Sequence, residues 1–341
     1  MSGRRDLRVD DGLCSIAVLL PCYNEERAIA STIRSFRAAL PRAKIYVYDN
    51  NSRDGTVVKA REAGAIVHTE RMQGKGHVVR RMFADIDADI YVLADGDATY
   101  DASAAMQMVT TLCDEQLDMV VGARHSEVDA AYRRGHRFGN WLLTSILAGI
   151  FGRSFTDILS GYRVFSRRFV KSFPALSRGF EIETEISVHA LELHMPIAEI
   201  ATRYATRPEG SMSKLSTYRD GLRILMTMIH LFRIEKPIPF FGIIAAIIML
   251  IALGLSVPLF ITYLETGLVP RLPTAVLVMG LVTVAVLNLF CGLILDTVVR
   301  GRLETRRLAY LTLTAPMSSA DGPAVKKPRK SPAKAKVTLS G

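Results

Sequence analysis

The stretch Ile90–Asp101, IYVLADGDATYD, decides the fold of this chain. It begins as an apolar run typical of a buried strand and ends in two carboxylates, Asp95 and Asp97, with Gly96 between them. Open α/β sheets bind ligands at the carboxyl ends of their strands, and two carboxylates placed there repel each other unless a cation lies between them. Because Asp-Gly pairs are also common in β-turns, this stretch alone leaves a plain turn and a metal site as alternatives.

Short apolar runs on either side of this stretch alternate with segments of helical periodicity. The other predicted strands of this region cover residues 15–20, 44–48, 65–68 and 117–122. This alternation predicts an α/β fold with a mainly parallel sheet and helices on both faces. The polar clusters all follow predicted strands, so we expect them to meet at one edge of the sheet, as a nucleotide site requires.

The middle of the chain is less regular. Residues 138–151 are apolar at helical spacing, which is typical of a core helix or of a helix that touches lipid. Residues 179–194 predict a helix, and Glu181, Glu183 and Glu185 near its start are interpreted mainly as complements of the helix dipole. A strand and then a polar loop rich in Arg, Ser and Lys are predicted from residue 197 onward.

The composition points to a membrane or to phosphate-bearing ligands. The chain has 341 residues, a formal net charge of +10 and 49% hydrophobic residues. The basic excess fits nucleic acid or, alternatively, an anionic membrane face or a phosphate-bearing substrate, and two long apolar spans favour the second. The four cysteines lack CxxC spacing, which predicts reduced cytosolic thiols, and the polar N-terminus predicts no cleavable signal peptide.

Two apolar spans near the C-terminus predict a transmembrane hairpin. Residues 238–264 and 272–295 contain no charged residue, and each span exceeds the roughly 20 residues that cross a bilayer. The preceding segment, Tyr218–Arg233, is basic and amphipathic, which is typical of a helix lying on the membrane. Basic residues flank the outer ends of the hairpin, so the positive-inside rule predicts that both termini are cytosolic.

Seven motifs carry a resemblance to a known family. They are PCYNEE (21–26), YDNNSRDGT (48–56), the GKG turn (74–76), LADGDATYD (93–101), VVGARH (120–125), SGYRVFSRR (160–168) and RPEGSMSKL (207–215). Together they resemble the inverting family 2 glycosyltransferases, and within them the polyprenyl-phosphate glycosyltransferases of the dolichol-phosphate mannose synthase-like group. The resemblance covers about residues 14–235 and implies a GT-A fold, a Rossmann-like, mainly parallel sheet with helices on both faces.

With this resemblance the chain is expected to have five parts. They are an N-terminal tail (1–13), a GT-A catalytic domain (14–215), an interfacial juxtamembrane helix (216–236), a transmembrane hairpin (237–299, with spans at 238–264 and 272–296) and a basic, disordered cytosolic tail (300–341). The tail is rich in Pro, Ala and Lys, a composition that favours disorder and contact with anionic lipid.

The resemblance also implies which residues bind the donor, a UDP- or GDP-linked sugar. The residues expected around the nucleotide are Pro21, Tyr23, Asn24, Glu25, Asp49, Asn51, Asp54, Lys75, Asp95 and Gly96. Among them, Asp49 would bind the base. Asp95 and Asp97 would hold the Mg²⁺ or Mn²⁺ that bridges the diphosphate, with Asp97 as the direct ligand, and the metal would stabilise the leaving nucleoside diphosphate as a Lewis acid.

The acceptor is expected to be an anionic polyprenyl phosphate, undecaprenyl or dolichyl, which needs cations close to the donor. The candidates are Arg124, Arg137, Arg163, Arg207 and Lys214, with Ser211 and Ser213 as donors from the same loop as the last two. A phosphate nucleophile is already ionised at neutral pH, so no general base is strictly required. Asp157, placed in the active-site region by the resemblance, is therefore expected to act as a base or to orient Arg163 or the acceptor.

Other functions fit the sequence less well. A processive polysaccharide synthase would carry a QxxRW motif, but the single Trp141 lies in FGNWLL. A non-catalytic membrane-anchored nucleotide-sugar sensor would lack one of the carboxylates or cations, and all are present. A nucleic-acid binder is disfavoured because the basic charge gathers beside the spans and in the tail. A UDP-sugar is favoured over GDP-mannose, the sugar itself is left open, and a homo-oligomer is expected in the membrane.

Overall fold

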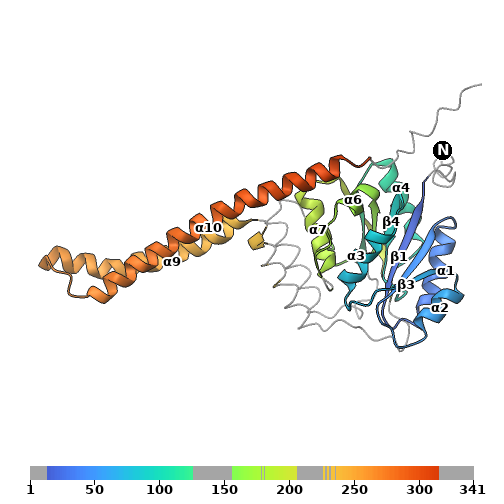
Figure 1. Cartoon of the computed structure of the whole chain (residues 1–341), viewed down its shortest axis with the longest axis horizontal. Helices are drawn as coiled ribbons and strands as arrows, with labels where there is room; N and C mark the ends of the chain where they lie inside the picture. Colours follow the sequence, from blue (N-terminus) through green and yellow to red (C-terminus); the bar gives the residue numbers. More distant parts are fainter. Residues whose placement is uncertain are drawn as a thin grey trace, which may run out of the picture.

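Within the described residues, seven strands form one mixed sheet (Figure 1). The computed structural model describes residues 14–125, 156–177, 179, 181–205, 226, 229, 232–234 and 236–314. The strands are β1 (Ile16–Cys22), β2 (Lys44–Asp49), β3 (Ile66–Thr69), β4 (Ile90–Leu93), β5 (Met119–His125), β6 (Arg163–Ser166) and β7 (Ile197–Arg203). Their order across the sheet is β3-β2-β1-β4-β6-β5-β7.

The pairing confirms the mainly parallel sheet that the sequence predicts. β1 pairs in parallel with β2 and with β4, β2 with β3, and β5 with β7. The exception is β6, which is antiparallel to its neighbours β4 and β5. The sequence did not predict β6, because a strand of four residues that begins with an arginine gives no readable periodicity.

Helices cover both faces of the sheet and bury two apolar cores. α1 (Ile29–Ala39), α2 (Thr56–Glu62) and α4 (Ala104–Asp114) pack on one face, and α3 (Lys75–Asp85), α6 (Arg167–Ser172) and α7 (Ile182–Glu192) on the other. Successive residues of a strand face opposite sides, so Leu19 joins the core beneath α3 and α7 while Val18 and Leu20 join the core beneath α1 and α4. This layering leaves the carboxyl edge of the sheet for the polar loops.

Two further helices, α9 (Pro237–Thr266) and α10 (Leu272–Leu311), pack side by side as a long hairpin that extends away from the sheet (Figure 1). Both are long and apolar enough to cross a membrane. Only 6% and 11% of their most apolar windows are buried, so neither is a core helix. The hairpin therefore exposes an apolar surface that water alone does not favour.

α10 corrects one expected boundary. It runs for 40 residues, through Asp296 and on to Leu311, so the expectation of a disordered tail from residue 300 is wrong for residues 300–311. The segment RLETRRLAYL is charged, but Leu, Glu, Arg and Ala are all strong helix formers. Most of the expected interfacial helix, the apolar segment 138–151, and residues 1–13 and 315–341 lie outside the described residues.

Candidate active site

The loops that follow β1 and β2 are joined by hydrogen bonds at the carboxyl edge of the sheet. The Asn24 backbone N–H donates to Ser52 Oγ at 2.8 Å, and Asn24 Oδ1 accepts from the Arg53 backbone N–H at 2.8 Å. The Glu25 backbone N–H donates to Thr56 Oγ1 at 2.8 Å. These bonds hold the segment that begins with Pro21 and Tyr23 beside the end of β2, as the parallel pairing predicts.

Asp49 closes β2 and is buried. Its Oδ2 accepts a hydrogen bond from the Ser52 backbone N–H at 3.1 Å. Its Oδ1 is also buried, and within the part of the chain that the structure describes no donor reaches it. A buried acceptor without a partner costs about 1–3 kcal/mol, so Oδ1 is suited to accept a hydrogen bond from a ligand.

Asn51 and Asp54, also expected at this site, shape its loops. Asn51 has a left-handed backbone with φ of 64°, and its Nδ2 donates to the Arg71 carbonyl at 2.9 Å. Asp54 Oδ1 accepts from the Thr56 backbone N–H at 3.1 Å at the start of α2. Both side chains are engaged with the protein itself.

Asn50 is a structural residue of the site that sequence reasoning missed. Its Nδ2 donates to the Glu70 and Met72 carbonyls at 2.9 and 2.8 Å, and its Oδ1 accepts from the Gly74 backbone N–H at 2.7 Å. These three bonds fix the turn that leads into α3, whose first residue is Lys75. The signal in the sequence was only a second asparagine in an Asn-Asn pair, which does not say which of the two points inward.

Lys75 lies buried between two carboxylates. Its Nζ is 2.5 Å from Asp95 Oδ1 and 2.6 Å from Glu183 Oε1. Burial alone would lower the pKa of Lys75, but the charges of Asp95 and Glu183 outweigh it and raise the pKa, so the ammonium stays protonated at neutral pH. The site therefore contains one buried cation shared by two anions.

The position of Glu183 corrects its interpretation as a complement of the helix dipole. The residue lies in the first turn of α7, as expected, but its side chain is buried and paired with Lys75, at the start of the distant helix α3. Its second oxygen, Oε2, is buried without a hydrogen-bond partner in the described part of the chain. Glu185, by contrast, accepts from the backbone N–H groups of Leu176 and Ser177, which is a structural role.

The loop after β4 carries Asp95 and Asp97 in a tight turn. Asp97 is buried, and its Oδ1 accepts from the Thr99 backbone N–H at 3.2 Å and from Thr99 Oγ1 at 2.6 Å. Ala98 has a positive φ of 60°. Gly96 is required here because a Cβ would collide with the Cys22 sulfur. The turn and the carboxylate pair are thus features of the same loop rather than alternatives.

This pair fits a divalent cation that arrives with a phosphate ligand. Among the described residues no three His, Cys, Asp or Glu side chains gather into a metal cluster. Mg²⁺ is commonly held by one or two carboxylates together with substrate phosphates. Asp95 and Asp97 supply two such carboxylates on one loop, and Lys75 forms an ion pair with Asp95.

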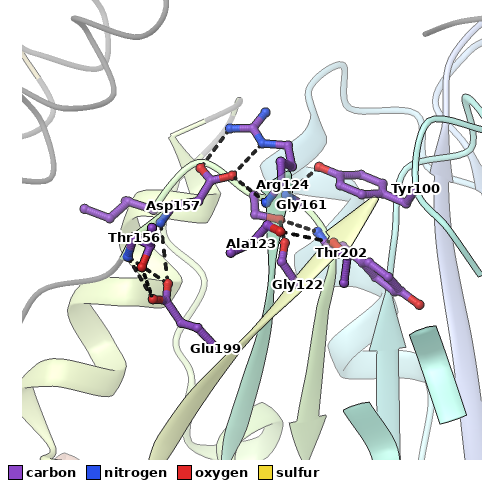
Figure 2. Close-up of polar contacts among 12 residues, drawn as sticks. Tyr100, Gly122, Ala123, Arg124, Thr156, Asp157, Gly161, Glu199 and Thr202 are labelled. Carbon is purple, nitrogen blue, oxygen red and sulfur yellow. Dashed lines mark hydrogen bonds and ion pairs between the residues drawn. The ribbon is translucent and has the colours of Figure 1, made fainter. Parts of the chain in front are cut away.

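A second ion pair, between Arg124 and Asp157, lies farther along the same edge (Figure 2). Arg124 lies near the end of β5, and its Nε and Nη2 donate to Asp157 Oδ2 and Oδ1 at 2.6 and 2.8 Å. The guanidinium also lies 5.5 Å from the centroid of the Tyr204 ring. Both oxygens of Asp157 therefore accept hydrogen bonds from Arg124. One expectation was that Asp157 orients Arg163, and these contacts do not support it.

Glu199 on β7 holds the segment that carries Asp157. Its carboxylate accepts from the Thr156 backbone N–H at 2.9 and 2.8 Å and from Thr156 Oγ1 at 2.7 Å, and Figure 2 shows it directly beneath that segment. Nearby, the Gly161 backbone N–H donates to Tyr100 Oη at 2.9 Å, which ties the turn before β6 to the Asp97 loop. Neither Glu199 nor Tyr100 was predicted, because no motif marks a contact between distant segments.

The placement of Arg163 contradicts its expected role in binding phosphate. It is fully buried, and its Nε and Nη2 donate to the carbonyls of Ser160 and Ile158 at 2.9 and 2.6 Å. Burial lowers the pKa of Arg163 to about 10, although the nearby carboxylates act in the opposite direction. Arg163 instead stabilises the turn before β6 through its hydrogen bonds to these backbone carbonyls. Five further candidates, Arg137, Arg207, Ser211, Ser213 and Lys214, lie outside the described residues.

A mainly parallel sheet with carboxylates, a buried lysine and an arginine at its carboxyl edge is typical of α/β proteins that bind a ligand at that edge. The chain belongs to glycosyl transferase family 2, whose sequence model matches residues 17–173. Glycosyltransferase AglJ of Haloferax volcanii is 35% identical over 251 residues, which are 73% of this chain and 82% of AglJ. A dolichyl-phosphate hexose transferase of the same organism is 26% identical over 210 residues, 61% of this chain and 90% of that protein.

A solved structure shows the same fold. Glucosyl-3-phosphoglycerate synthase of Mycobacterium tuberculosis, in complex with Mn²⁺, uridine diphosphate and glucosyl-3-phosphoglycerate, superposes with a TM-score of 0.53 at 22% identity. The match covers 64% of this chain and 81% of that one. The sheet is therefore of the GT-A type, and the protein is a glycosyltransferase.

Replacing Glu183 by Gln is expected to lower transferase activity by about tenfold to a hundredfold, the effect of removing one of the two negative charges that face a buried ammonium. The reason is that Lys75 would keep only one of its two carboxylates. The measurement is initial-rate kinetics with the donor varied. The matched control is Glu62→Gln, the same exchange at an exposed position of α2, which should stay within about threefold of wild type. Equal losses in both variants would contradict a specific role for Glu183.

Proposed function

We propose that this glycosyltransferase moves a sugar from a nucleotide-sugar, preferably a UDP-sugar, to the phosphate of a polyprenyl phosphate at the cytosolic face of a membrane. One observation carries the proposal. The same chain joins a GT-A sheet edge bearing cations and carboxylates to two long apolar helices that are almost entirely unburied. A water-soluble donor and a lipid acceptor need both parts in one molecule. The name of the dolichyl-phosphate hexose transferase relative agrees with this acceptor class.

The free oxygen of Asp49 supports a uracil base. Uracil offers one imide N–H on its pairing edge, whereas guanine offers an N–H and an amino group side by side. Asp49 Oδ2 is engaged by the Ser52 backbone, which leaves the buried Oδ1 as the single oxygen without a donor. One acceptor matches one donor, so the site favours UDP over GDP.

Asp95 and Asp97 would hold a Mg²⁺ or Mn²⁺ together with the donor diphosphate. The bound metal would stabilise the leaving nucleoside diphosphate as a Lewis acid. Lys75, which pairs with Asp95 and Glu183, would lie beside this group and would donate to a phosphate or sugar oxygen of the donor. The positive charge of Lys75 would thus offset the repulsion between the carboxylates that it contacts.

Arg124 is the described cation best suited to the acceptor phosphate. Its guanidinium is oriented by Asp157 and by the ring of Tyr204. Asp157 is then an orienting residue rather than a base, since both of its oxygens accept from Arg124. Catalysis by positioning suffices, because the phosphate nucleophile is already an anion.

The reaction that follows is a single displacement. An oxygen of the polyprenyl phosphate forms a bond to the anomeric carbon as the bond from that carbon to the donor diphosphate breaks. The electron pair leaves with the nucleoside diphosphate, and the anomeric configuration inverts. No proton has to be removed from the nucleophile. With α9 and α10 crossing the bilayer and arginines at the cytosolic end of α10, the catalytic domain and both termini lie in the cytosol.

The direct test is to incubate membranes containing the protein with polyprenyl phosphate, Mg²⁺ and a panel of radiolabelled nucleotide sugars. One UDP-sugar should label the lipid fraction, and Asp97→Ala should label it far less. If no donor labels the lipid, the proposed function is wrong. If Asp97→Ala labels as well as wild type, the metal assignment is wrong.

Replacing Asp49 by Asn is expected to weaken UDP binding by about tenfold to a hundredfold. The amide would keep the bond to Ser52 with its oxygen and would present an N–H group to the imide N–H of uracil, so two donors would meet. Isothermal calorimetry with UDP and Mg²⁺ measures the change. The control is Asp87→Asn, an exposed carboxylate paired with Arg167, which should bind UDP as wild type does. Unchanged binding by Asp49→Asn would place the base elsewhere.

Replacing Asp157 by Asn separates an orienting role from a catalytic base. If Asp157 orients Arg124, the KM for the acceptor should rise by about tenfold, from the weakened ion pair, while the pH profile of kcat keeps its shape. If Asp157 is a catalytic base, its loss should instead cause a large fall in kcat and change the acidic limb of the pH profile. Steady-state kinetics between pH 5.5 and pH 8.5, a range of about three units that spans neutrality, distinguishes the two.

A further inference from the structure

The cytosolic part of α10 docks on the catalytic domain at the edge of the sheet opposite the active site. Figure 1 shows that α10 extends beyond the end of α9 and that its C-terminal part lies beside α6. Its docking face consists of Leu303, Arg306 and Tyr310, whose spacing of three and four residues places them on one side of a helix. Leu303 and Tyr310 pack against the apolar core beneath α7 and α6, although most of α10 is exposed.

The polar contacts of this face are specific. Arg306 Nη1 lies 2.7 Å from Glu192 Oε2 at the end of α7, and the carboxylate is mostly buried. Tyr310 Oη donates to Asp118 Oδ2 at 2.7 Å. The charge of Arg306 also adds to the effect of burial in lowering the pKa of His189, on α7, to about 3. The helix is thus held at two points that are four residues apart.

Asp118 is the centre of the second point. It is fully buried just before β5, and it also accepts from Ser166 Oγ at 2.7 Å and from Arg168, whose Nη2 lies 2.9 Å from Oδ2. The Arg168 guanidinium lies 4.8 Å from the centroid of the Tyr310 ring, so Tyr310 contacts both members of the ion pair. A hydrogen bond to a buried, already paired carboxylate is stronger than one at the surface.

A continuous helix transmits position. α10 is unbroken from Leu272 to Leu311, and Asp296 is the first charged residue after the apolar span. At a rise of 1.5 Å per residue, Arg306 lies about 15 Å and Tyr310 about 21 Å beyond Asp296 along the helix axis. A flexible linker of this length would leave the domain free to tumble above the bilayer, whereas a docked helix fixes both its height and its orientation.

We propose that the docking face of α10 is a strut that sets the position of the active site relative to the lipid surface, so that the phosphate of a membrane-embedded acceptor meets Arg124 without a search. Arg306 and Tyr310 are thus positioning residues that act through the orientation of the domain and do not touch either substrate. The inference rests on the proposed function, because it assumes an acceptor held in the membrane. Its particular consequence is that the contacts matter for long, membrane-bound acceptors and not for short, soluble ones.

The test compares the full-length wild type in liposomes with Arg306→Glu, which sets two carboxylates against each other at Glu192. The matched control is Arg302→Glu, the same charge reversal at an exposed position of the same helix. With undecaprenyl phosphate in the bilayer, Arg306→Glu should lose about tenfold or more in kcat/KM, the factor expected when an attractive buried contact becomes repulsive. With a water-soluble short-chain prenyl phosphate it should stay within about twofold of wild type. Arg302→Glu should resemble wild type with both acceptors.

Two kinetic results would overturn the strut. If Arg306→Glu equals wild type with both acceptors, the contact does not position the site. If it loses equally with both, the contact only supports folding. Tyr310→Phe, which removes one hydrogen bond but keeps the ring, should shift the same long-chain to short-chain ratio in the same direction and by less.

Amide hydrogen exchange measures whether the end of α10 is docked, and it needs no substrate. Residues 303–311 should be protected in the wild type and should exchange faster in Arg306→Glu, together with the end of α7. Rapid exchange of 303–311 in the wild type would refute the strut. A wild type that uses neither acceptor would refute the proposed function instead, and the exchange result would still decide the docking.

Discussion

The buried ammonium of Lys75 is the contact on which the donor side of the site depends. Asp95 and Glu183 each place a carboxylate oxygen within 2.6 Å of its Nζ, and two carboxylates so close together would repel each other without a cation between them. Lys75 reaches them because Asn50 fixes the turn before α3. The order of the strands then decides the rest, since β1, β2 and β4 are neighbours and end at one edge.

The two ion pairs of the site differ in burial and in how their cations are held. Lys75 lies deep and is shared by two anions, so it can respond to a ligand that brings its own charge. Arg124 lies nearer the surface and is held by both oxygens of Asp157, so its direction is fixed before any ligand arrives. Preorganised charge of this kind stabilises a developing anion without the cost of reorienting a flexible side chain. Tyr100 couples the two regions through Gly161.

The hairpin is attached to the catalytic domain by more than chain connectivity. Because α10 continues past its apolar part and contacts Asp118 and Glu192, the two long helices and the sheet are packed together. The contact lies at the amino edge of the sheet, so the carboxyl edge remains open to substrates.

The sequence by itself determined the elements that depend on local pattern. Alternating apolar runs and helical periodicity predicted the parallel sheet and its helices, uninterrupted apolar length predicted the hairpin, and the motif around Asp95 and Asp97 predicted a site at the end of β4. Only the tertiary structure decided which charges meet. Glu183, thought to serve its own helix, pairs with Lys75, and Arg163 turns inward to backbone carbonyls. Such contacts join residues that are far apart in the chain. Whether a charged side chain contacts a ligand or stabilises the fold depends on its burial. Periodicity cannot assign burial to a single charged side chain.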